Sequence, residues 1–164
     1  MSTEPWLPEL EYYENYGRSW DDYESALYAI FKTDFIDSQP FFHGKPVHIR
    51  KHPMEYGKEE AFFHVTCQDY QKNHDRSPDF RRCERIRWIK AFIEHYADCD
   101  AMKIWDEPIR STVRTHLLLE EERYIVVLEK RENYYLLVTA FYLEHEHTLR
   151  NKLQHYKQYH SRKQ

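Results

Sequence analysis

Glycine is scarce in this chain, with 3 residues among 164. A P-loop or a Rossmann fold binds phosphate through several glycines at fixed spacing, and the sequence contains neither pattern. It also lacks the G-x-S-x-G turn that presents a nucleophilic serine in α/β-hydrolases. No HExxH motif and no structural-zinc spacing of cysteine and histidine occur. These absences argue against nucleotide-binding folds, serine hydrolases and the common zinc sites.

Cysteine and long apolar runs are scarce as well. The three cysteines, Cys67, Cys83 and Cys99, form no CxxC pair. An odd number, with one on an apolar helix face, suits reduced thiols in the cytoplasm. The acidic, polar N-terminus does not read as a signal peptide, and no apolar run approaches the roughly 18 residues that span a bilayer. We therefore expect a cytoplasmic protein without a membrane partner.

Aromatic residues, in contrast, are abundant: 14 Tyr, 9 Phe and 4 Trp. The length suffices for one domain with a core of its own. The net charge of −4 excludes a uniformly basic nucleic-acid-binding protein. Charge is unevenly placed, however, because residues 1–24 are acidic and every charged side chain from Arg150 to Lys163 is positive. A local basic surface remains compatible with the sequence.

The succession of patterns predicts an α+β domain, with N-terminal helices followed by a four-stranded antiparallel β-sheet and a C-terminal helix. Apolar spacing predicts helices at 20–35, 77–96 and 145–159. Short apolar, β-branched or aromatic runs at 102–105, 113–119, 123–129 and 134–142 predict an antiparallel meander.

Three further segments complete the chain. Residues 47–50 begin an extended piece, residues 58–66 suit either a helix or a strand, and residues 68–77 form a polar loop. We expect a single compact domain, in which residues 1–40 form an acidic N-terminal arm and helix and residues 41–160 form the functional part.

Arginines lie on the apolar side of the helix predicted at 77–96. An advance of 100° per residue puts Arg82 and Arg85 inside the apolar arc, Arg81 at its edge and Arg87 towards solvent. Cations on the core side are costly unless they meet an anion. Arg82 and Arg85 therefore form either a buried ion pair or an anion site, for which planar guanidinium groups suit phosphate.

Other side chains have similar pairs of interpretations. His64, in the apolar segment F-F-H-V-T, is a core histidine or, if it faces the arginines, a general acid or base. Thr139 is a strand former or a hydroxyl at the site, and Lys152 is a snorkelling lysine or a second cation for the same anion. The histidines could bind a metal, but no supporting spacing accompanies them, so we expect none.

Six segments then occur in a suggestive order: V-H-I-R at 47–50, F-F-H-V-T at 62–66, R-R-C-E-R-I-R-W-I at 81–89, Y-I-V-V-L at 124–128, Y-Y-L-L-V-T-A-F-Y at 134–142 and R-N-K-L at 150–153. Over residues 40–157 the chain thereby resembles phage and mobile-element proteins of the barnase–EndoU–colicin–RelE (BECR) nuclease superfamily. The acidic arm lies outside the resemblance.

The resemblance implies a metal-independent endoribonuclease without a cofactor, a toxin-like or phage-conflict effector. Its chemistry would be attack of the ribose 2′-OH on the adjacent phosphate, which leaves a cyclic phosphate. The implied catalytic residues are His64, Arg82, Arg85 and Thr139. The implied RNA- or phosphate-binding residues are Arg81, Tyr142, Lys152, His48 and Arg50. RNA is the expected partner, and a protein antitoxin or inhibitor is a candidate partner.

Two alternatives stay open. One is a catalytically inactive protein of the BECR fold that binds RNA or a partner protein through its aromatic surface and acidic arm. The other is a metal-dependent hydrolase that uses the histidines. Cleavage of RNA in the presence of EDTA separates all three.

Overall fold

The structure, a computed structural model, describes residues 4–68 and 77–162. Residues 69–76 of the polar loop expected at 68–77 lie outside the described part. The α-helices are α1 (Trp20–Phe35), α2 (Glu60–Thr66), α4 (Phe80–Glu84), α5 (Ile86–His95) and α6 (Glu146–Arg162). The strands are β1 (Phe41–Phe42), β2 (Lys45–Ile49), β3 (Met102–Ile109), β4 (Thr112–Leu119), β5 (Tyr124–Lys130) and β6 (Tyr135–Tyr142). Two 3₁₀ turns, Tyr13–Tyr16 and Tyr96–Asp98, precede α1 and follow α5.

The prediction of a four-stranded antiparallel sheet is wrong. The sheet has six strands in the order β1-β2-β6-β5-β4-β3 and is mixed. The meander β3 to β6 is antiparallel, but β2 joins it in parallel, with Val47 to Ile49 opposite Tyr135 to Leu137. A meander alone would leave the outer edge of β6 with unpaired backbone groups, and β2 pairs with its first three residues, Tyr135 to Leu137. The α+β class and the closing helix agree with the prediction.

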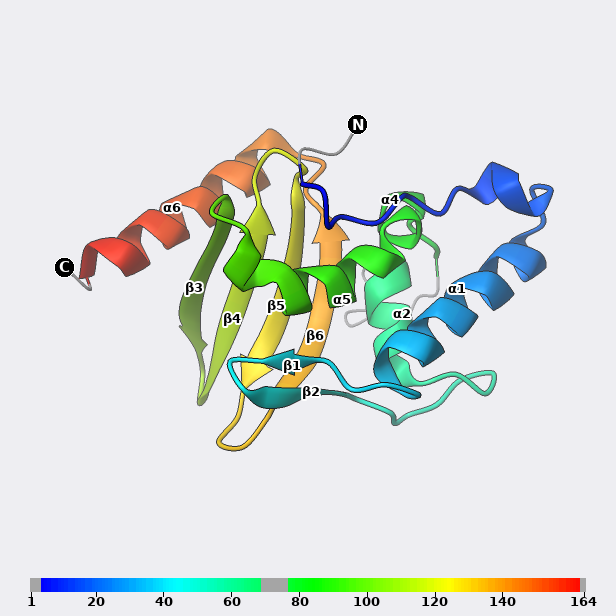
Figure 1. The fold of residues 1–164 in the computed structure, drawn as a ribbon, viewed down its shortest axis with the longest axis horizontal. Coiled ribbons are helices and arrows are strands. Elements are labelled where there is room, and N and C mark those ends of the chain that lie inside the picture. The colour runs from blue at the N-terminus through cyan, green and yellow to red at the C-terminus, as the bar shows by residue number, and fades with distance from the viewer. Residues whose placement is uncertain (1–3, 69–76, 163–164) are drawn as a thin grey trace.

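Helices cover both faces of the sheet (Figure 1). On one face, α5 crosses the strands, and its buried side chains join those of α1 in the larger core. On the other face, α6 lies diagonally, and Leu149 packs with Trp105 and Leu118 in a smaller core. Because α6 crosses only part of this second face, the region beside β6 is bordered by α2 instead. Among the described residues, no helix is long and apolar enough to cross a membrane.

The N-terminal arm packs onto this body. The Trp88 indole donates to the Pro8 carbonyl (2.8 Å), and Arg87 pairs with Glu11 (2.7 Å). The buried Tyr23 hydroxyl donates to the Glu11 carbonyl (2.6 Å), which ties the arm to α1. The acidic arm is therefore anchored by backbone hydrogen bonds and by an ion pair.

The helix expected to run continuously from Ser77 to Tyr96 is two helices. Asp79, not Ser77, caps the first, because its carboxylate accepts from the backbone N–H groups of Arg81 (3.0 Å) and Arg82 (3.3 Å). The backbone at Arg85 leaves the helical region (φ −105°, ψ 19°), so α4 ends and α5 begins there. Side chains before and after Arg85 therefore do not follow a single helical projection.

Candidate functional site

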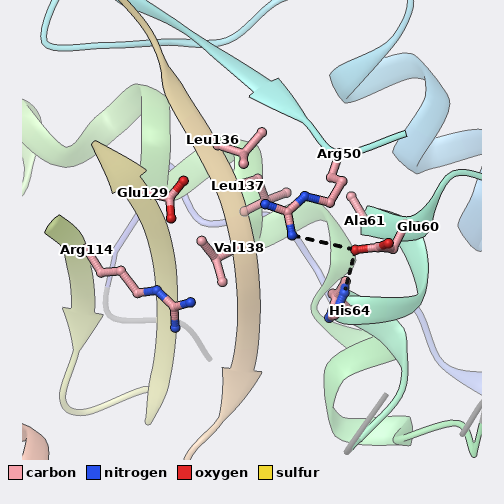
Figure 2. Close-up of a pocket in the computed structure, with 9 residues that line it drawn as sticks. All are labelled: Arg50, Glu60, Ala61, His64, Arg114, Glu129, Leu136, Leu137 and Val138. Carbon is pink, nitrogen blue, oxygen red and sulfur yellow. Dashed lines mark hydrogen bonds and ion pairs between the residues drawn. The ribbon is translucent and has the colours of Figure 1, made fainter. Parts of the chain in front are cut away.

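A pocket opens on the second face of the sheet, between β6 and α2 (Figure 2). Its cavity volume is about 30 Å³, and it is partly open to solvent. Strands β4, β5 and β6, helix α2 and the residue that follows β2 all contribute to its walls. The lining residues are Arg50, Glu60, Ala61, His64, Arg114, Glu129, Leu136, Leu137 and Val138.

An acid–base pair lies in the wall formed by α2. Glu60 and His64 are one helical turn apart and share a face, and His64 Nε2 lies 3.1 Å from Glu60 Oε1. Arg50 approaches the same carboxylate oxygen, at 3.9 Å. Figure 2 shows Glu60 between these two partners. Glu60 is buried, so its carboxylate holds the imidazole and the guanidinium at fixed positions.

Burial lowers the pKa of His64 below its ordinary value, because desolvation disfavours the imidazolium. The hydrogen bond and the charge of Glu60 act in the opposite direction, while the cations Arg50 and Arg82 add to the lowering. The neutral imidazole is therefore the form present at neutral pH. A neutral histidine beside a carboxylate is equipped to accept a proton.

Two charged side chains face the pair from the sheet. Arg114 on β4 and Glu129 on β5 are directly opposite in the antiparallel register, and both line the pocket. Glu129 is ion-paired with Arg131. The Nε of Arg114 is buried and has no hydrogen-bond partner among the described residues. The guanidinium groups of Arg50, Arg114 and Arg131 carry three positive charges in this region. The carboxylates of Glu60 and Glu129 carry two negative charges, so one positive charge is unmatched when His64 is neutral.

The polypeptide behind His64 is held by two predicted site residues. The His64 carbonyl accepts a hydrogen bond from Thr139 Oγ1 (2.8 Å) and another from Arg82 Nη1 (3.0 Å). Arg82 also pairs with Asp79 (3.4 Å) and lies over the Phe141 ring. Thr139 and Arg82 therefore position the His64 backbone from outside the pocket, because neither side chain is among those that line it.

The other arginines of this region point elsewhere. Arg85 is buried, donates to the Arg81 carbonyl (3.0 Å) and to Glu84 (3.2 Å), and lies over the rings of Tyr142 (4.6 Å) and Trp88 (5.2 Å). It borders a separate cavity under the N-terminal arm. Arg81 is exposed beside Glu84. The structure therefore does not bring Arg81, Arg85 or Tyr142 to His64.

Lys152 belongs to a different group of charges, where α6 meets β3 and β4. Its charge acts on Glu107 and His116. Glu107 accepts from Trp105 Nε1 (2.8 Å) and lies 3.4 Å from His116 Nε2 and 3.3 Å from His155 Nδ1. Burial above all, with the charge of Lys152, lowers the pKa of His116 to about 4. No group of metal-binding side chains is found in the described parts of the chain.

Of the nine residues predicted for the site, His64 and Arg50 line the pocket, and His48 lies on β2, two residues before Arg50, exposed at the surface. Sequence reasoning missed Glu60, Arg114 and Glu129. A signal for Glu60 existed: four residues separate it from His64, which places the two on one face if 60–66 is a helix. Arg114 and Glu129 become neighbours only through strand pairing, which the sequence pattern does not specify.

Comparison with protein-family models, with curated proteins and with solved structures found no match to this chain. Its function must therefore be inferred from the chemistry of the pocket itself.

Proposed function

We propose that the protein is a metal-independent endoribonuclease, a toxin-like or phage-conflict effector that works in the cytoplasm. It would cleave RNA by attack of a ribose 2′-OH on the adjacent phosphate. The observation that carries the proposal is the His64–Glu60 pair, 3.1 Å apart, in a pocket that also contains Arg50 and Arg114. The six-segment resemblance to BECR nucleases adds support for the reaction class.

In the proposed reaction, neutral His64 accepts the proton of the 2′-OH. The 2′-oxygen forms a bond to phosphorus, and the bond between phosphorus and the 5′-oxygen breaks. The proton held by His64 then passes to the departing 5′-oxygen, so the products are a 2′,3′-cyclic phosphate and a 5′-hydroxyl. Glu60 stabilises the imidazolium that exists between the two proton transfers. No metal ion or cofactor takes part.

The arginines supply the electrostatic part of the mechanism. The phosphorane-like transition state gains negative charge, and preorganised cations at that position lower its free energy. Arg114 is suited to this role, because it lines the pocket and its Nε has no hydrogen-bond partner among the described residues. Arg50 lies 3.9 Å from Glu60, which makes a weak ion pair. A phosphate oxygen could take the place of Glu60 beside Arg50 with little loss of free energy. Arg82 and Thr139 act as positioning residues through the His64 carbonyl.

The test is cleavage of a fluorescent RNA oligonucleotide in EDTA, with the cyclic phosphate identified by mass spectrometry. Removal of a general base typically lowers the rate about 10²- to 10⁴-fold, which is the loss expected for His64→Ala. Arg114→Ala should lose about 10²- to 10³-fold. His145→Ala, an exposed histidine before α6, is the matched control and should cleave at the wild-type rate. A DNA strand of the same sequence lacks the 2′-OH and should remain intact.

The pH profile provides a second readout. Since the neutral imidazole is the base, the rate should rise with pH through the lowered pKa of His64 and then reach a plateau. Glu60→Gln removes the interactions that raise the pKa of His64, so the rising limb should move to lower pH while the plateau falls. Full-rate cleavage by both His64→Ala and Glu60→Gln would refute the site. Loss of wild-type cleavage in EDTA would refute the metal-free mechanism. RNA binding without cleavage would favour the inactive RNA-binding alternative.

A further inference from the structure

Two aromatic rings lie at the surface close to the proposed site. His48 is an exposed residue of β2, and Tyr134, half-buried, immediately precedes β6. Their ring centroids are 5.0 Å apart, with 56° between the planes. Tyr134 is fixed by the β5–β6 hairpin, because its carbonyl accepts from the Arg131 N–H (2.9 Å).

The imidazole of His48 is also held in place, although it is exposed. Gln39 Nε2 donates to the Val47 carbonyl (2.8 Å) and lies 3.4 Å from His48 Nδ1. The amide nitrogen carries two hydrogens, so it can serve both acceptors. His48 Nδ1 then accepts, and in the neutral ring Nε2 carries the hydrogen. An exposed ring of fixed orientation and fixed tautomer loses little entropy when a ligand stacks on it.

Strand register connects this pair to the pocket. His48 is opposite Leu136, Leu136 is opposite Glu129, and Glu129 is opposite Arg114. A single row of neighbouring side chains therefore leads from His48 across β6 and β5 to Arg114. Three of these four residues line the pocket. With strands about 4.8 Å apart, the row is about 14 Å long.

Two arginines lie close to the rings along the chain. Arg50 follows His48 by two residues, just beyond the end of β2, and lines the pocket, whereas Val47 and Ile49 of β2 are buried on the face opposite His48. Arg131 lies in the hairpin beside Tyr134. The side chains of Arg50 and Arg131 are 52% and 41% exposed, and each is also paired with a carboxylate, Glu60 and Glu129 respectively. Aromatic rings with arginines nearby suit the alternation of bases and phosphates in a single-stranded nucleic acid.

We propose that His48 and Tyr134 form a stacking subsite for one nucleobase of single-stranded RNA, next to the phosphate held between Arg50 and Arg114. This subsite rests on the proposed function, since it binds a nucleotide adjacent to the cleaved one. Stacking is tolerant of base identity because every base has a π-face. Arg50 and Arg131 each lie near a carboxylate, so stacking carries a large share of the affinity here.

Binding can be measured independently of cleavage. The probe is a fluorescein-labelled hexaadenylate RNA, and the protein is the full chain carrying His64→Ala, which slows turnover enough for the titration. Anisotropy titrations compare this protein with versions that add Tyr134→Leu, Tyr134→Trp or His48→Ala. Tyr56→Leu, at a tyrosine that is 75% exposed, is the matched control. A ribose-phosphate hexamer without bases is the matched ligand.

Loss of one base stack corresponds to about 5- to 150-fold weaker binding, which is the expected effect of Tyr134→Leu. Tyr134→Trp keeps a ring and should bind within about twofold of the parent, and Tyr56→Leu should have no effect. For the abasic hexamer, Tyr134→Leu and its parent should bind equally. The salt dependence should be unchanged by Tyr134→Leu, whereas Arg50→Ala should reduce its slope by about 1, as expected when one phosphate contact is lost.

The subsite would be overturned if Tyr56→Leu weakened binding of the hexaadenylate as much as Tyr134→Leu does. It would also be overturned if Tyr134→Leu weakened binding of the abasic hexamer as much as binding of the hexaadenylate. Wild-type affinity in both Tyr134→Leu and His48→Ala would overturn it as well; the second variant guards against a folding defect, because His48 is exposed. These outcomes are separate from those of the cleavage assay. If binding depends on the rings of Tyr134 and His48 but no cleavage occurs, the subsite is supported and the proposed reaction is refuted. If cleavage occurs but binding does not depend on the rings, the reaction is supported and the subsite is refuted.

Discussion

The hydroxyl of Tyr124 provides a sharp test of the described core. Tyr124 is fully buried on β5, where its ring meets Trp88 and Phe92 edge-to-face at 5.6 and 5.4 Å. Its hydroxyl oxygen has no hydrogen-bond partner among the described residues. Burial above all raises the pKa of this hydroxyl, so it remains protonated at every accessible pH. The substitution Tyr124→Phe removes this one group and keeps the ring.

The expected result is an increase in stability. A buried hydroxyl without a hydrogen bond lowers the free energy of unfolding by about 1–3 kcal/mol, as judged from mutational data. The space left by one oxygen atom reduces that gain by a few tenths of a kcal/mol. Tyr124→Phe should therefore raise the free energy of unfolding by about 1 kcal/mol or more, which raises the Tm by about 2–4 °C per kcal/mol for a domain of this size.

A matched control uses the same atomic change at a satisfied hydroxyl. Tyr23 is equally buried, but its hydroxyl donates to the Glu11 carbonyl at 2.6 Å. Tyr23→Phe should lower the free energy of unfolding by about 1–2 kcal/mol, because a hydrogen bond is lost and the arm carbonyl is left unpaired. Urea denaturation followed by tryptophan fluorescence measures both variants. Destabilisation of similar size in both would show that the Tyr124 hydroxyl has a partner, and the reasoning would fail.

Two further predictions concern other buried polar groups. The pKa of His116 is lowered to about 4 in the folded state, whereas in the unfolded chain it is about 6.5. As the pH falls from about 6.5 to 4, the unfolded chain therefore takes up a proton that the folded protein does not, and the free energy of unfolding falls by about 3 kcal/mol in total. Above about pH 6.5 this group has no effect on stability. His116→Gln should flatten this part of the pH–stability curve and the exposed His145→Gln should not; parallel curves for His116→Gln and wild type would contradict the assignment. Asp79→Ala should cost about 1 kcal/mol in urea denaturation through loss of the α4 cap, while Asp79→Asn, which keeps the acceptor oxygen, should lose less than half of that.

Local periodicity was sufficient for much of the fold. The stripe that contains Tyr23, Leu27 and Phe31 predicts α1 with its observed bounds, and the capping role of Ser19 is confirmed by its hydrogen bond from the Asp22 N–H. The four meander strands appear within a few residues of their predicted positions, because hairpins are specified by neighbouring residues. An extended piece was predicted at 47–50, but its place in the sheet as the parallel strand β2 was missed. Its five residues carry no signal that names β6 as a partner.

The arginine region shows why side-chain facing could not be predicted. A projection of 100° per residue assumes an unbroken helix, and the backbone at Arg85 breaks it. Arg82 is thereby turned to the His64 carbonyl, whereas Arg85 is turned to Trp88 and Tyr142. Arg87 was expected to face solvent; it is about half exposed and pairs with Glu11 of the arm, a partner distant in the sequence. Long-range contacts, not local pattern, decide the position of each cation.

The parallel pairing of β2 with β6 also determines when the site can exist during synthesis. Residues 47–49 must wait for residues 135–137 to emerge, which takes on the order of 10 s at ordinary translation rates. Until then β2 has only the two-residue β1 beside it, and its apolar side chains Val47 and Ile49 lack their sheet. Contacts between residues so far apart in the sequence slow folding. Until β6 is available, the unpaired edge of β2 can also associate with other chains. For a proposed ribonuclease, the same delay means that Arg50, Glu60 and Arg114 come together in the described arrangement only after residues 135–137 have emerged, so a shorter nascent chain lacks the complete site.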